Sequence, residues 1–387
     1  MMMRRVRTSL GYLSAERFVM NTAYRFVYPF LPVIARGLGV PLEQAALLIS
    51  ARHIAGLATP AVTRAVGQRP RRLIATGLVL FIVGSTVTVL INAYVGALLG
   101  FALIGIAKPV FDVSSQAYVS ARVPYSNRAR YLSVFEFTWA GALLIGAPAT
   151  GWLISRTSWS APFVVFAVLT GISLLLLTRF VDADPQFGIQ TGLATPITSS
   201  GRAFLFVAGF FALASEMIIV VFGAWMENSF GLSLVALGGV AFVIGASELA
   251  GEGATFAFTD RLGKRRAVLV GLGISVVGFA LLVPAQNTMG IGLAVLGLAL
   301  FGFEFTIVSS IPLASELMPA SRARYLGWMV VSMSLARGVG AALGPYLFES
   351  FGLAGPAIAA VAADVVAAAL LFSSVHEPTE HTNTKVP

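Results

Sequence analysis

The sequence has no cysteine among its 387 residues and only three histidines. It can therefore form no disulfide bond, no thiol nucleophile and no cysteine-ligated metal site. Two of the histidines, His376 and His381, lie near the C-terminus, so a histidine metal site is not expected either. We expect the protein to need no metal and no other cofactor.

Charged residues are also scarce, at 11% of the chain, against about a quarter in a typical soluble protein. Hydrophobic residues make up 57%, and the mean hydropathy is +0.86. No water-soluble fold of this size could bury so much apolar side chain, which excludes soluble enzymes and soluble DNA-binding proteins. A membrane-spanning helix needs about 20 apolar residues. The sequence therefore predicts an all-α polytopic membrane protein with room for twelve spans.

Twelve apolar stretches can be traced, six on each side of a polar segment. They cover residues 10–35, 42–62, 73–91, 94–119, 131–153, 160–177, 203–225, 234–258, 267–283, 291–313, 325–348 and 353–374. This pattern predicts an N-terminal six-helix bundle over residues 1–180, a linker over 181–202, a C-terminal six-helix bundle over 203–376 and a tail over 377–387.

Lysine and arginine are distributed unequally between the spans. Of the 26, nineteen fall on one side, and only Arg36 and Arg156 fall on the other. Because cytoplasmic loops are enriched in basic residues, we expect both termini and the linker to be cytoplasmic, in the inner (plasma) membrane of a bacterium. The basic N-terminus leads into a full-length span without a cleavage site, so no removable signal peptide is expected. The net charge of +9 is explained in this way, and nucleic acid is not an expected partner.

The two halves of the chain repeat one another. The sequence Arg-Ala-Arg-Tyr-Leu at residues 128–132 recurs at 322–326, an offset of 194, and residues 99–105 match 296–302 at an offset of 197. A nearly constant offset over several spans indicates duplication. Two six-helix bundles in the same orientation should be related by a pseudo-two-fold axis along the membrane normal, with a cavity between them.

Two motifs indicate a family. The loop signature Gly-x-x-x-Asp-Arg-x-Gly-Arg/Lys-Arg/Lys is matched by residues 260–266, although Phe256 replaces the leading glycine, and the first copy is degraded. The pattern Gly-Pro-x-x-Gly occurs at residues 147–151 with alanine in first place, and its counterpart lies at residues 340–345. The chain resembles the major facilitator superfamily, and within it the twelve-span drug:proton antiporters and sugar-efflux transporters.

The resemblance implies roles for the motif residues. The loop residues would latch the two halves together in the outward-facing state. In the first copy of the loop, Arg64 replaces the expected acid. The latch residues are Asp260, Arg261, Gly263, Lys264, Arg265, Gly67 and Arg69. Small residues let helices approach closely and prolines bend them, which suits Pro148, Gly151, Gly340, Gly344 and Pro345. The second pattern is associated with export in the family.

Ionisable residues inside spans are costly and mark function by default. On the first span, Arg17, Asn21, Tyr24, Arg25 and Tyr28 fall within about 100° and should face the interior. The other candidate cavity residues are Arg52, Lys108, Glu136, Trp139 and Arg337.

Several of these groups have both a structural and a functional interpretation. Lys108 and Asp112, one turn apart, should pair, either as a fixed ion pair or as one that opens for substrate or proton. Glu136 should pair with an arginine of the first or second span, or else bind a cationic substrate. Trp225 is interpreted as an anchor at the membrane interface.

The C-terminal half carries more acid than base within its spans. Glu248 and Glu252 lie one turn apart and cannot both ionise cheaply, and the cation there is Arg337. The acids either form a structural cluster with Arg337 or relay protons. The proton-coupling candidates are Glu248, Glu252, Glu304, Glu216, Asp112 and His53.

These observations predict a secondary transporter that exports a small amphipathic molecule by alternating access in exchange for protons, and that functions as a monomer. The alternatives are a facilitator or proton symporter for an organic anion, a sugar or a lipid-like substrate, and, more remotely, an intramembrane enzyme or a scaffold. The nucleotide-binding motif Gly-x-x-x-x-Gly-Lys-Ser/Thr is absent, as are the HExxH and GxSxG motifs of hydrolases. We therefore expect neither ATP-driven transport nor an enzyme.

Overall fold

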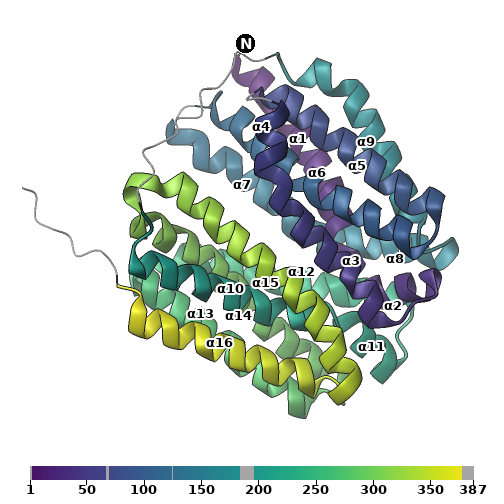
Figure 1. Cartoon of the computed structure of the whole chain (residues 1–387), viewed down its shortest axis with the longest axis vertical. Helices are drawn as coiled ribbons and strands as arrows, with labels where there is room; N and C mark the ends of the chain where they lie inside the picture. Colours follow the sequence, from purple (N-terminus) through teal and green to yellow (C-terminus); the bar gives the residue numbers. More distant parts are fainter. Residues whose placement is uncertain (1, 67–68, 124, 184–195, 377–387) are drawn as a thin grey trace, which may run out of the picture.

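The computed structural model describes residues 2–66, 69–123, 125–183 and 196–376. All regular secondary structure within these ranges is helical, as predicted. Figure 1 shows two helical bundles, one from each half of the chain.

In the described part of the N-terminal half there are nine α-helices and two short helical turns. Their bounds are α1 (Met2–Arg25), α2 (Val27–Leu38), α3 (Leu42–Ala55), η1 (Gly56–Ala58), α4 (Thr59–Val66), α5 (Pro70–Ile91), α6 (Tyr94–Ser120), α7 (Tyr125–Gly141), η2 (Ala142–Gly146), α8 (Ala147–Arg156) and α9 (Ala161–Phe180).

Residues 196–376 of the C-terminal half form seven α-helices and one short turn. Their bounds are α10 (Ser199–Ile219), α11 (Phe222–Phe230), α12 (Leu234–Leu262), α13 (Lys264–Ala285), α14 (Met289–Leu317), η3 (Pro319–Ser321), α15 (Arg322–Phe351) and α16 (Ala354–Ser374). The expected tail and most of the expected linker lie outside the described residues.

Eleven stretches of the described chain are long and apolar enough to cross a membrane. The predicted span nearest the N-terminus is not among these eleven. It is formed by α1 and α2, which are separated by a break at Phe26, and it brings the number of spans to twelve. Its hydropathy is lowered by polar residues that face the protein interior, among them Arg17 and Arg25. The seventh span has the same break between α10 and α11, and α11 begins 195 residues after α2. The predicted duplication is therefore visible in the helix geometry.

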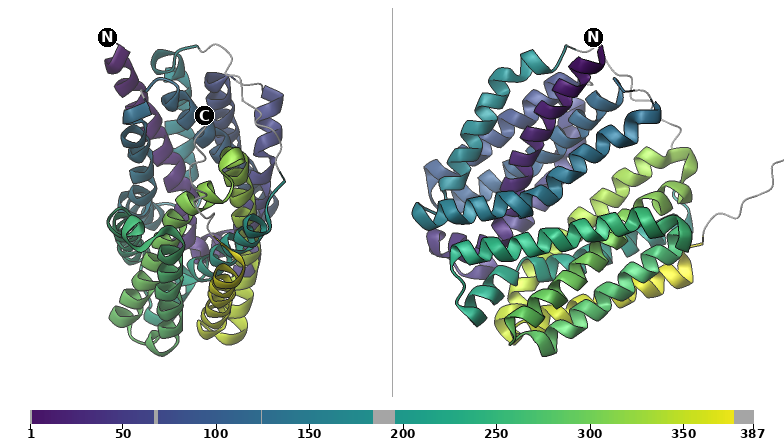
Figure 2. Two further views of the ribbon diagram at one scale, coloured as in Figure 1. Left: turned by 90° about the vertical axis from the view of Figure 1, so that its left-hand side faces the viewer. Right: turned by 180° about the vertical axis from the view of Figure 1, so that it is seen from behind.

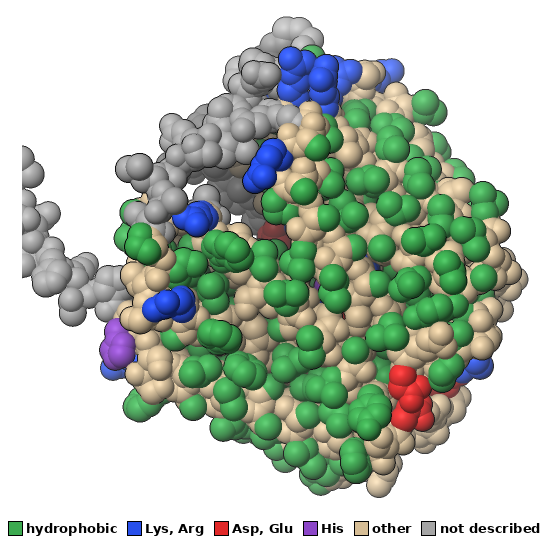
Figure 3. Space-filling model, in the orientation of Figure 1, with side chains coloured by type: hydrophobic (Ala, Val, Ile, Leu, Met, Phe, Trp, Pro, Cys, Tyr) green, Lys and Arg blue, Asp and Glu red, His purple; other side chains and the backbone are tan. Residues whose placement is uncertain are grey.

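One side of the molecule gathers the helix ends that lead to the linker, and we call it the linker side. There the Ser9 hydroxyl donates to the Phe180 carbonyl (2.6 Å), which joins the start of α1 to the end of α9. The Tyr325 hydroxyl donates to the Gly201 carbonyl (2.7 Å), which joins the start of α15 to the start of α10. Most Lys and Arg side chains on the face drawn in Figure 3 lie toward this side.

On the far side the two bundles are in contact. Arg36 at the end of α2 forms a bidentate ion pair with Glu227 of α11 (2.7 and 3.1 Å). The Ser50 hydroxyl of α3 donates to the Gly338 carbonyl of α15 (2.7 Å). Figures 1 and 2 show the bundles meeting near α2 and α11 and diverging toward the linker side. The halves are thus closed on the far side and apart on the linker side.

Glycines allow the two bundles to approach closely. A Cβ at Gly238 of α12 would lie 2.8 Å from the Pro148 Cα, and a Cβ at Gly151 of α8 would lie 2.7 Å from the Leu234 carbonyl oxygen. The π-helical turn η2 directly precedes α8, which carries Pro148. The predicted close packing is therefore confirmed at Gly151. It is also present at Gly344, where a Cβ would lie 2.6 Å from the Met217 carbonyl oxygen of α10.

The predicted latch residues lie on the linker side. Lys264 pairs with Glu316 at the end of α14, and Arg265 donates to the Phe372 carbonyl of α16 (2.6 Å), so both bind within the C-terminal half. Asp260, Arg261 and Arg69 are exposed. Gly263 has a positive φ of 84°. Gly67 lies outside the described residues. Their role as a latch in the outward-facing state stays a prediction.

Gly238→Leu should separate α12 from α8, because its side chain would overlap the backbone at Pro148. Overpacking of this kind costs about 1–3 kcal/mol, so we expect a clearly lower melting temperature of the purified protein. Gly239→Leu serves as the control, because a Cβ at the adjacent Gly239 would meet open space. Equal melting temperatures for the two variants would show that this contact does not hold the halves together.

Candidate functional site

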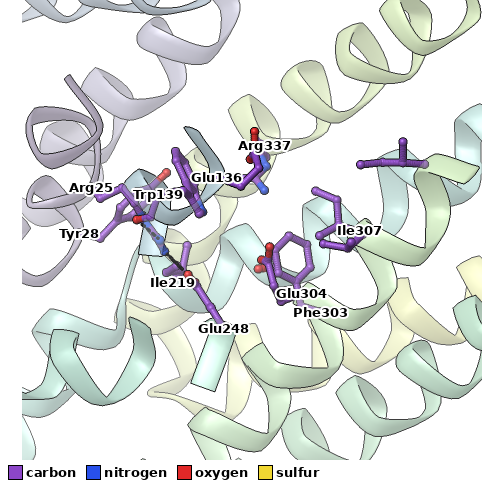
Figure 4. Close-up of a pocket in the computed structure, with 13 residues that line it drawn as sticks. Arg25, Tyr28, Glu136, Trp139, Ile219, Glu248, Phe303, Glu304, Ile307 and Arg337 are labelled. Carbon is purple, nitrogen blue, oxygen red and sulfur yellow. Dashed lines mark hydrogen bonds and ion pairs between the residues drawn. The ribbon is translucent and has the colours of Figure 1, made fainter. Parts of the chain in front are cut away.

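A cavity of about 200 Å³ lies between the two bundles (Figure 4). Helices of both halves contribute to its wall, so it lies at the predicted interface. Figure 3 shows the surface hollowed between the halves on the linker side. The lining residues are Arg25, Tyr28, Glu136, Trp139, Ser215, Ile219, Glu248, Phe303, Glu304, Ile307, Val308, Ile311 and Arg337.

Four charged side chains form a cluster within the N-terminal half. The Arg17 guanidinium of α1 donates to Asp112 of α6 (3.0 Å) and to Glu136 of α7 (3.3 Å). Lys108 pairs with the same Asp112, which confirms the predicted contact one helical turn away. Glu136 also pairs with an arginine of the first span, as one interpretation expected, yet half of its side chain is exposed. The cluster carries two positive and two negative groups and is balanced.

An ion pair joins the two halves beside the cavity. The Arg25 guanidinium donates to the Glu248 carboxylate of α12 (2.7 Å), and the two side chains are only 2% and 4% exposed. Arg25 also lies over the Trp139 ring, 4.4 Å from its centroid. Figure 4 shows Arg25 and Glu248 pointing at one another across the interface. Glu248 is therefore compensated by a charge from the other half.

Glu216 of α10 forms the centre of a second contact between the halves. It accepts a hydrogen bond from the Tyr28 hydroxyl (2.8 Å) and lies 3.4 Å from the His53 Nε2, and both partners belong to the N-terminal half. Arg337 of α15 lies 3.7 Å away. The Glu216 side chain is only 1% exposed. Its carboxylate is thus held by groups from three other helices.

Arg52 and Asn21 support this network within the N-terminal half. Arg52 donates to the Tyr24 carbonyl (2.6 Å) and to the Tyr28 hydroxyl (3.1 Å), and its guanidinium lies 3.5 Å from the Tyr24 ring centroid. The Asn21 amide donates to the Thr138 hydroxyl (2.9 Å) and joins α1 to α7. Arg52 therefore helps to fix the position of Tyr28, which binds Glu216, and Asn21 fixes α1 against α7.

Glu304 and Glu252 differ from the paired acids Asp112, Glu136, Glu216 and Glu248. Among the described residues, neither has a hydrogen bond or ion pair. Glu304 of α14 lies in the cavity wall beside Phe303 (Figure 4). Glu252 of α12 is partly exposed and lies one turn from Glu248. Glu304 is therefore a cavity carboxylate that an incoming cation or proton can reach without displacing an arginine.

The arrangement of two six-helix halves around a charged cavity can now be compared with known proteins. The sequence profile of the Major Facilitator Superfamily matches residues 17–194 and 204–387. The chain belongs to the major facilitator superfamily. It is therefore a multi-pass membrane transporter for small molecules.

Relatives within the superfamily include transporters with different named functions. The chain is 24% identical to the uncharacterized MFS-type transporter YwfA of Bacillus subtilis over 342 residues, which cover 83% of this chain and 80% of that protein. It is 25% identical to the class G tetracycline resistance protein of Vibrio anguillarum over 293 residues, or 67% and 70% of the two chains.

Solved structures of the superfamily share the fold. A D-xylose–proton symporter has a TM-score of 0.75 at 16% identity, with 96% of this chain and 98% of that chain covered. A bacterial homolog of the human lysosomal transporter Spinster, in an inward-facing and unoccupied conformation, has a TM-score of 0.74 at 15% identity, with 95% and 96% covered. At these identities the likeness concerns the fold alone.

Two interpretations from the sequence need correction in this superfamily member. The sequence alone balances the acids of the C-terminal half against a cation of the same half, but Arg25 of the other half pairs with Glu248. Trp225 is not an interface anchor, because it is buried and its indole donates to the Gln286 carbonyl (3.1 Å). The apolar cavity residues Phe303 and Ile219 were missed, since nothing distinguishes them from other apolar residues of a span.

Removal of either partner of the Arg25–Glu248 pair should strongly destabilise the protein. An unpaired buried charge costs about 3–5 kcal/mol, and loss of both partners costs much less. We expect Arg25→Met and Glu248→Met each to lower the melting temperature more than the double variant does, measured in one detergent.

The exposed pair Arg36–Glu227 provides the matched control. It also joins the halves, but Arg36 is 59% exposed, so its loss should cost about 0–1 kcal/mol. Additive effects of the two Met substitutions at Arg25 and Glu248 would show that these side chains are not coupled.

Proposed function

We propose that this transporter exports a small amphipathic molecule, cationic in charge, in exchange for protons by alternating access. The observation that carries the proposal is the cavity between the halves, where Glu304 has no cation partner among the described residues. Such a carboxylate can bind a proton or a cationic substrate, but not both at once. Because the proton and the substrate compete for the Glu304 carboxylate, proton entry and substrate export depend on each other.

The orientation in the membrane follows from charge. The linker side carries most of the basic residues between spans, so this side faces the cytoplasm of a bacterial inner membrane. The cavity would then receive its substrate from the cytoplasm, because the halves are apart there and in contact on the far side.

Protonation has a direct physical role in this cycle. When the halves close around the cavity, water leaves, and an ionised Glu304 without a partner would be costly to bury. A bound proton or a bound cation removes that cost. The transporter would therefore change conformation when Glu304 is occupied, and would export substrate in one direction and admit protons in the other.

The contacts favour a cation over an anion. Arg17, Arg25 and Arg337 each face a carboxylate, and an anionic substrate would have to displace one of these acids. The aromatic faces of Phe303 and Trp139 add apolar surface for an amphipathic molecule. An anion facilitator or symporter is therefore less well supported than exchange of a cation.

The proposal can be tested with ethidium, a planar aromatic cation, in proteoliposomes. We expect an imposed pH gradient to drive ethidium transport and Glu304→Gln to reduce it about tenfold or more, because a contact to a charged group contributes about 1.5–3 kcal/mol. The measurement is the initial rate of ethidium fluorescence change.

Glu349→Gln is the control, because Glu349 is an exposed acid outside the cavity. Equal flux with and without the pH gradient would exclude proton exchange. A wild-type rate in Glu304→Gln would assign the coupling to another carboxylate, and transport of D-xylose or benzoate in place of ethidium would overturn the substrate class.

A further inference from the structure

A second, open hollow of about 880 Å³ lies on the outside of the molecule, between α3 of the N-terminal half and α15 of the C-terminal half. We call it the α3–α15 groove. Figure 1 shows these two helices side by side. The residues that line the groove are Pro41, Glu43, Gln44, Leu47, Ser50, Ile54, Gly338, Val339, Ala342, Leu343 and Tyr346.

The walls of the groove are apolar and face outward from two membrane spans. Leu47, Ile54 and Val339 are exposed to the surroundings of the protein. Both helices are long and apolar enough to cross the membrane, α3 together with its continuation. In a bilayer, the surroundings of these side chains are lipid. An acyl chain is therefore the molecule that meets this groove at the highest local concentration.

The length of the groove fits one leaflet. Glu43 lies in the first turn of α3 on the far side, and Ile54 lies eleven residues further along the chain. At 1.5 Å per residue this is about 16 Å, which is about half of the ~30 Å hydrocarbon core. The groove thus runs from the membrane surface on the far side to about the middle of the bilayer.

Apart from the Ser50 hydroxyl, which is bound to the Gly338 carbonyl, the polar side chains of the groove lie at one end. Glu43, Gln44 and Tyr346 lie at the end near the membrane surface, where a lipid headgroup would be. Glu43 has no hydrogen bond or ion pair among the described residues, although the start of α3 offers it a favourable helix dipole. A carboxylate beside an amide oxygen is suited to accept hydrogen bonds from a primary ammonium group.

We propose that the α3–α15 groove is a binding site for a phospholipid with a primary ammonium headgroup, such as phosphatidylethanolamine, from the leaflet on the far side. Its ammonium binds Glu43 and Gln44, and one acyl chain lies along Leu47, Ile54 and Val339. This site is separate from the cavity and does not depend on the identity of the transported substrate.

The site also has a consequence for the conformational cycle. Its two walls belong to different halves, and the hydrogen bond from Ser50 to Gly338 joins them within the groove. A lipid can contact both walls only while α3 and α15 are together, that is, while the far side is closed. The bound lipid therefore stabilises this conformation relative to the one that opens on the far side.

Native mass spectrometry of the purified protein can test the site directly. The protein is reconstituted with equal amounts of phosphatidylethanolamine and phosphatidylcholine, transferred to detergent, and the retained lipid is counted. We expect about threefold preference for phosphatidylethanolamine, the size expected for one partly exposed charged contact. Glu43→Gln should abolish the preference without changing the melting temperature.

A second pair of variants tests the acyl-chain position. Val339→Trp should fill the groove and reduce retention of both lipids, whereas Leu175→Trp, at a more exposed position of α9 outside the groove, should not. Equal retention of both lipids by the wild type, or an unchanged preference in Glu43→Gln, would overturn the headgroup assignment. Unchanged lipid retention in Val339→Trp would overturn the lipid site. So would a mass of two protein copies that is present for the wild type and absent for Val339→Trp, because a second copy of the protein would then occupy the groove.

Discussion

The structure depends on one constraint: a charge inside a helical bundle surrounded by lipid must either be paired or have access to water. The N-terminal half satisfies it internally with the Arg17, Lys108, Asp112 and Glu136 cluster. The C-terminal half satisfies it only with help from the other half, because Glu248 is paired with Arg25. The two halves are therefore held together by charges that neither half could bury alone.

This interdependence limits how the halves can move. The pairs that join them at depth, Arg25 with Glu248 and Tyr28 with Glu216, involve the break in the first span and the region before the break in the seventh. Contacts near an axis of rotation change least when two bodies rock against each other. Exposed contacts further out, such as Arg36 with Glu227, would separate first and at little cost. Deep pairs can thus keep the halves together while the surface contacts open and close.

The sequence was sufficient for the fold and for local contacts. Hydropathy located the spans, and helical spacing predicted that Lys108 would meet Asp112 four residues away. It could not predict that Arg25 meets Glu248, because 223 residues separate them and nothing in either span encodes the register between halves. Trp225 shows the same limit, since only the packing of α11 against its neighbours decides that a tryptophan at a span end is buried.

Two buried acids lie away from the cavity, and the duplication relates their positions. In the N-terminal half, Glu16 of α1 accepts a hydrogen bond from Thr170 of α9 (2.8 Å). Asp364 of α16 lies 194 residues after Thr170, the offset of the sequence repeat, and is buried too. Glu16 therefore has a hydrogen-bond partner on the last span of its half, whereas the Asp364 Oδ1 has no hydrogen-bond partner among the described residues. Thr170 and Asp364 occupy equivalent positions in the two last spans, so the duplication places a buried polar group at this position in both halves, although only one of the two is an acid.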